Sequence, residues 1–153
     1  MDIKTLHDTI RTACLNVNGV QSFAFGWPAD RTRGADPQSG SEQSYPRAFM
    51  AVPTMFTDSI RRQRTYNITL FFDDLQGYSN DGSADTATQL EQWAALEAMA
   101  ASFKSAWDAL GLTNAPDYAA IVGNIATTYD SFASSQRLCS VVLTFTVTTK
   151  GAC

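Results

Sequence analysis

Hydrophobic residues recur every three or four positions in two stretches of the chain, the spacing that places one apolar stripe on a helix. In the first stretch they are Ile3, Leu6, Ile10, Ala13, Cys14 and Val17. Asp2 is placed to cap the start of this helix, and Asn18-Gly19 to stop it. The pattern predicts a first helix that packs on a sheet.

The second and longer helical stretch runs from about Asp85 to Leu110. Asp85 or Thr86 would cap its start. Gln89 is placed for a capping box, and Gly111 stands at the exit. Apolar residues gather on one broad face, which we expect to be core: Trp93, Leu96, Met99, Ala100, Phe103, Ala106, Trp107 and Leu110. The opposite face carries small and charged residues, which either meet water or admit a neighbouring backbone.

Elsewhere apolar and polar residues alternate, which is the period of a β-strand. Five strands are predicted in this way, at residues 22–27, 48–52, 64–72, 118–129 and 137–149. The last two flank a turn at 130–135 and should form an antiparallel hairpin.

This order of elements, α-β-β-β-α-β-β, predicts an α+β fold with one mostly antiparallel or mixed sheet of about five strands and two helices packed on it. A length of 153 residues fits a single domain covering 1–153, and no internal repeat or linker interrupts it. Residues 28–45 form a long loop with nothing to anchor a core. Such loops are either functional or mere hairpin tips.

Composition excludes several classes of protein. Hydrophobic residues make up 44% of the chain, which rules out wholesale disorder, yet no apolar run approaches the roughly 20 residues of a membrane span. No export signal is visible. A net charge of -4 is opposite in sign to that of a typical nucleic-acid binder. Cys14, Cys139 and Cys153 are too few and too widely spaced for a disulfide framework or a zinc site, so we expect reduced thiols made in a cytosol.

Two groups of residues have the composition of a reactive site. His7 and Cys14 are seven apart on one helix face, as a thiol and base dyad would be, although a histidine at the edge of the core is the better interpretation. Asp73, Asp74, Asp81 and Asp85 place four carboxylates close together, but without the spacing of a calcium loop. Since no catalytic motif is present, we expect no enzyme activity, cofactor or metal.

Charge is unevenly distributed along the chain. Residues 30–64 carry a net charge of +2, with six arginines, whereas residues 73–117 carry -7, with a single lysine. Opposite patches on one molecule favour head-to-tail assembly, which closes into rings. The alternatives are an incidental surface pattern, or arginines at 61, 62 and 64 that protect an edge strand from aggregation.

The order of these elements, with several sequence segments, resembles the small tail terminator or tail completion proteins of tailed bacteriophages. The segments are Asp2–Leu6 in the first helix, Arg64–Leu75 followed by Ser79-Asn80, the long helix, and the final strand Leu138–Thr149 before Gly151–Cys153. The resemblance covers nearly the whole chain.

It implies a structural virion protein, made in the host bacterial cytoplasm, that forms a ring, usually a hexamer. The ring would cap the tail tube, end its polymerisation and bind the head-tail connector or stopper, with DNA passing through the channel without sequence-specific binding. The implied assembly contacts are Arg31, Arg33, Arg47, Arg61, Arg62, Arg64, Asp73, Asp74, Asp81 and Asp85.

Two alternatives remain open at this point. One is another protein of the head-tail junction, such as a head completion protein or connector adaptor. The other is a monomeric ligand-binding domain or small enzyme that uses Cys14 with His7, or the aspartates near residue 73.

Overall fold

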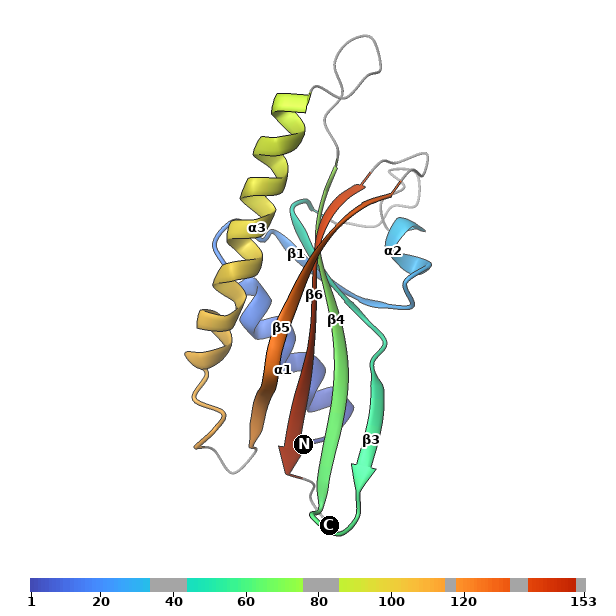
Figure 1. The fold of residues 1–153 in the computed structure, drawn as a ribbon, viewed down its shortest axis with the longest axis vertical. Helices are drawn as coiled ribbons and strands as arrows, with labels where there is room; N and C mark the ends of the chain where they lie inside the picture. Colours follow the sequence, from blue (N-terminus) through green and yellow to red (C-terminus); the bar gives the residue numbers. More distant parts are fainter. Residues whose placement is uncertain (34–43, 76–85, 115–117, 133–137, 151–153) are drawn as a thin grey trace.

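The computed structural model describes residues 1–33, 44–75, 86–114, 118–132 and 138–150 (Figure 1). Two long helices, one single-turn helix and six strands lie in these ranges. In chain order they are α1 (Ile3–Leu15), β1 (Ser22–Gly26), α2 (Asp30–Arg33), β2 (Arg47–Ala51), β3 (Thr54–Asp58), β4 (Gln63–Leu75), α3 (Thr86–Asp108), β5 (Ala119–Phe132) and β6 (Leu138–Lys150).

The predicted α+β class is confirmed, with one strand more than expected. The additional strand, β3, has no apolar alternation because all five of its residues are exposed, so only its backbone pairing with β4 reveals it. Within the predicted loop at 28–45, residues Asp30–Arg33 form α2, while 34–43 lie outside the described residues.

The strands form one mixed sheet in the order β1-β2-β4-β6-β5, with β3 also paired to β4. Only β1 and β2 are parallel to each other; the other described pairs are antiparallel. Both β2 and β3 pair with the same side of β4, β2 with Leu70–Asp73 and β3 with Gln63–Asn67. On this side of β4, β3 is therefore the edge strand beside the first half of β4, and β1, paired to β2, is the edge strand beside the second half. On the opposite side of the sheet, the edge strand is β5.

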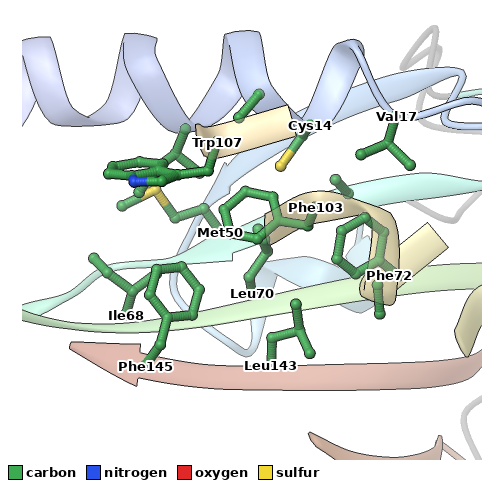
Figure 2. Packing of buried hydrophobic residues seen from close by; sticks show 14 of the residues in the cluster. Cys14, Val17, Met50, Ile68, Leu70, Phe72, Phe103, Trp107, Leu143 and Phe145 are labelled. Carbon is green, nitrogen blue, oxygen red and sulfur yellow. The ribbon is translucent and has the colours of Figure 1, made fainter. Parts of the chain in front are cut away.

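The main core lies between the sheet and the two long helices (Figure 2). β4 and β6 direct alternate side chains toward α3, where Phe103 packs against Phe72 at 6.5 Å and Phe145 at 5.4 Å between ring centroids. The apolar face expected on α3 is confirmed, since its members are buried or packed against the core. The stripe expected on α1 is also buried, except for Ile3, which is 43% exposed.

The helix ends follow the expected capping chemistry. The Asp2 side chain accepts a hydrogen bond from the Thr5 amide at 2.8 Å, which satisfies one of the free N–H groups of the first turn of α1. Gly111, just after α3, has a φ of 66°, a conformation that favours glycine. Trp27 differs from expectation: it lies beyond the end of β1 and is 64% exposed.

Truncation of Phe103 tests the assignment of the core. Phe103→Ala should lower the free energy of unfolding by about 3–5 kcal/mol, because a fully buried ring is replaced by a cavity. The exposed control Ser105→Ala, on the same helix, should change it by less than about 0.5 kcal/mol. Urea denaturation measures both, and equal small effects would contradict this packing.

Candidate functional site

A row of polar side chains crosses the face of the sheet opposite α1 and α3. Arg47 on β2 pairs with Asp73 on β4, which in turn pairs with Ser140 on β6, and Ser140 pairs with Asp130 on β5. Each lies one residue out of phase with the core residues of its strand, so all four point to the second face. α2 places Arg31 over this row.

The side chains of this row are joined by short contacts. Asp73 Oδ2 lies 3.1 Å from Arg47 Nη2, and its Oδ1 lies 3.7 Å from Arg31 Nε and accepts a hydrogen bond from Ser140 Oγ. Arg31 Nη2 is 3.3 Å from Asp130 Oδ2, and its guanidinium lies 4.1 Å from the centroid of the Phe71 ring. Arg47 also donates to the Arg31 backbone carbonyl at 2.8 Å. These contacts connect α2 to three strands.

We call Arg31, Arg47 and Asp73 the buried ionic cluster, and its contacts lie within the chain. Arg31, Arg47 and Asp73 are 3%, 1% and 0% exposed, so a partner cannot reach their side chains in this conformation. Burial raises the pKa of Asp73, while the two arginines and the hydrogen bond from Ser140 act in the opposite direction. Three of the ten residues predicted as assembly contacts are therefore occupied within the chain.

The other predicted contacts lie elsewhere. Arg61 and Arg62 are exposed, and Arg64 is half-buried. Asp74 is partly buried, which raises the pKa of its carboxyl group, and its Oδ1 accepts the Leu75 amide hydrogen at 2.8 Å. The side chain of Arg33 and residues Asp81 and Asp85 lie outside the described residues. The assembly role of all these residues stays a prediction.

Arg61 and Arg62 belong to an exposed surface at the turn between β3 and β4, seen at the lower end of the sheet in Figure 1. We call Met55, Phe56, Ile60, Arg61 and Arg62 the hairpin surface. Its three apolar side chains are 49%, 62% and 93% exposed. Met55 and Phe56 are adjacent on β3 and therefore point to opposite faces of the hairpin, and Ile60 lies in the turn that follows. Large apolar side chains exposed at one end of a hairpin are typical of an interaction site.

Local hydrogen bonds hold this turn in shape. Asp58 Oδ1 accepts the amide hydrogens of Ile60 and Arg61, each at 3.0 Å, as in an Asx turn. Arg62 closes the loop with a φ of 52°, a left-handed conformation that is unfavourable for arginine. Ile60, Arg61 and Arg62 are thus presented on a structured loop.

A groove lies between α3 and β5, on the face of the sheet that α3 covers. It has a volume of about 340 Å³. The residues that line this α3–β5 groove are Glu97, Ala100, Ala101, Lys104, Ile125, Thr127, Tyr129 and Leu143. Ala100, Ile125 and Leu143 form its less exposed part, and exposed polar side chains form its rim. The sequence indicated small residues on this side of α3 but not the groove, which depends on where β5 lies.

Polar contacts order the rim of the groove. The Tyr129 ring packs edge to face on Trp93 with centroids 6.2 Å apart, and its hydrogen bond with Glu97 raises the pKa of the phenol. Lys104 pairs with Asp108 one turn further along α3. Glu97 is the acidic residue among those that line the groove.

The predicted His7 and Cys14 dyad is not assembled for catalysis. Cys14 is fully buried, and burial raises the pKa of its thiol, which disfavours the reactive thiolate. The His7 ring packs on Phe23 and Phe25, with Nδ1 2.9 Å from Asp8 Oδ1. The described residues contain no cluster of three or more side chains suited to hold a metal ion. None of their helices is long and apolar enough to cross a membrane.

Comparison of the chain with protein-family models and with curated proteins finds no match.

Removal of Arg47 tests the buried ionic cluster. Arg47→Ala should lower the free energy of unfolding by about 3–5 kcal/mol, because it leaves the Asp73 carboxylate buried beside a cavity. Arg61→Ala is the matched control, with an exposed ion pair, and should change stability by less than about 1 kcal/mol. Urea denaturation of both variants decides; an Arg47→Ala variant as stable as the control would refute the internal role of the cluster.

Thiol accessibility provides a second check. At pH 8 a disulfide reagent should leave Cys14 and Cys139 unmodified in the folded protein, because both are buried and burial raises the pKa of Cys139 to about 11. Both should react once the protein is unfolded in urea. Peptide mass mapping measures each site separately, and rapid modification of native Cys14 would restore the nucleophile hypothesis.

Proposed function

We propose that the protein is a tail terminator: a structural virion protein whose ring, a hexamer, caps the tail tube, ends its polymerisation and joins it to the head connector. The role of the protein is structural, and it needs no cofactor. DNA passes through the ring without sequence-specific contacts, and the ring resides at the head-proximal end of the tail.

The hairpin surface is the observation that carries this proposal. It places exposed Ile60, Arg61 and Arg62 on a structured turn, next to exposed Met55 and Phe56 at the end of β3, where a partner protein can bind them. A protein that acts by assembly needs such a surface, whereas a small enzyme needs a reactive group in a cleft. Cys14, the nucleophile considered from the sequence, is buried on the face of α1 that packs into the main core.

The opposite edges of the sheet give further support. β3 and β5 lie on opposite sides of the central strands. All five residues of β3 are exposed, as are seven of the twelve β5 residues whose side chains the structure describes. Unequal surfaces on opposite edges favour head-to-tail contacts, which generate rings when the rotation closes.

The proposal is tested by adding the purified protein to growing tail tubes of the same phage. Tubes should stop at a defined length and carry a ring at one end in electron micrographs. Light scattering should detect a ring-sized species at about 50 mM salt, and its mass should fall at about 500 mM salt because the exposed charge pairs between subunits are screened. Tubes that grow unchanged would refute the terminator role, and binding to connectors but not to tubes would favour another junction protein.

A further inference from the structure

We propose that the hairpin surface of one copy docks into the α3–β5 groove of the next copy, with Ile60 entering the groove and Arg61 and Arg62 binding the Glu97 side of its rim. This inference rests on the proposed function, since it supplies the subunit contact of the ring.

The size and chemistry of the groove suit an apolar side chain presented by a loop. Its volume of about 340 Å³ is at the low end of small-molecule pockets, which span about 300–1,000 Å³. Its interior is apolar, with Ala100, Ile125 and Leu143. Ile60 is 93% exposed at the tip of the hairpin, so it can enter such a groove without rearrangement of its own chain.

Charge is complementary between the two surfaces. Residues 54–67 contain three arginines and one aspartate, a net charge of +2, whereas α3 contains three acids and one lysine, a net charge of -2. The lysine, Lys104, is already paired with Asp108. Glu97 lines the groove and shares a hydrogen bond with Tyr129, and a carboxylate has room for two further hydrogen bonds from an arginine. Arg61 would exchange its exposed pair with Asp58, at 3.9 Å, for Glu97.

The edge of β5 disfavours the competing arrangement, in which sheets of neighbouring copies join through their backbones. The register of β5 shifts between Val122 and Ala126, and Gly123 there has a φ of 75°. Such a bulge interrupts the row of N–H and C=O groups that another strand would need. Side chains in the groove, rather than the strand edge, therefore make the contact.

Because the two surfaces lie on opposite edges of one sheet, no copy can dock its own hairpin into its own groove (Figure 1). The contact is heterologous, so each chain offers one hairpin and one groove. This asymmetry gives a decisive experiment with two variants, each of which removes one surface.

Ile60→Asp removes the hairpin surface, and Ala101→Arg fills the groove and repels the arginines. Both positions are exposed, so both variants should fold as the wild type does. Each should weaken self-association at least about tenfold in sedimentation velocity. The matched controls are Ile3→Asp, at another exposed isoleucine, and Ala98→Arg, on α3 outside the groove; both should assemble normally.

Mixing the two variants identifies the contact. An equimolar mixture should form a one-to-one complex and nothing larger, because only one intact hairpin and one intact groove can meet. Normal assembly of either variant, no complex in the mixture, or a wild type that stays monomeric at about 1 mM would overturn the inference. Its failure is distinct from that of the terminator role: rings that ignore both variants but cap tubes overturn only the contact, and rings that follow the variants but ignore tubes overturn only the function.

Discussion

The antiparallel pairing of β4 with β6 is the constraint on which the rest of this structure depends. It runs without interruption over thirteen residue pairs, from Gln63 with Lys150 to Leu75 with Leu138. Because side chains alternate along a strand, a slip by one residue would exchange the two faces. The large apolar residues would then leave the main core, and Asp73 would enter it. One register therefore determines both what α1 and α3 cover and where the polar row forms.

On the second face of the sheet, the same register brings charged and polar residues together. Asp73 is buried between two arginines, an arrangement that adds little net stability because each charge loses its hydration. Its consequence is positional: Arg31 reaches Asp73 only when α2 lies over the sheet, and the Phe71 ring lies beneath its guanidinium. Arginines that would serve assembly if exposed instead hold the segment after β1 in place.

The two surfaces left for partners differ in their relation to the core. β3 contributes nothing to either hydrophobic cluster, whereas the α3–β5 groove opens onto the edge of the main core at Ala100, Ile125 and Leu143. A strand such as β3 retains exposed apolar side chains at little cost to folding. Since edge strands with exposed apolar groups tend to associate, a controlled contact at these edges is consistent with the proposed ring.

The apolar periods of α1, α3, β4 and β6 were sufficient to predict both helices, the final hairpin and the α+β class, because each period reports which side of an element is buried. They did not reveal β3, whose exposed residues leave no period, nor the parallel pairing of β1 with β2. Charge counts identified Arg47 and Arg61 alike as contacts, although one is buried and the other exposed. Burial of a polar residue depends on which distant residues the sheet register brings beside it. That register, between strands about 70 residues apart, placed Ser140 next to Asp73, and the position of β5 beside α3 formed the α3–β5 groove, so only the tertiary structure decided both.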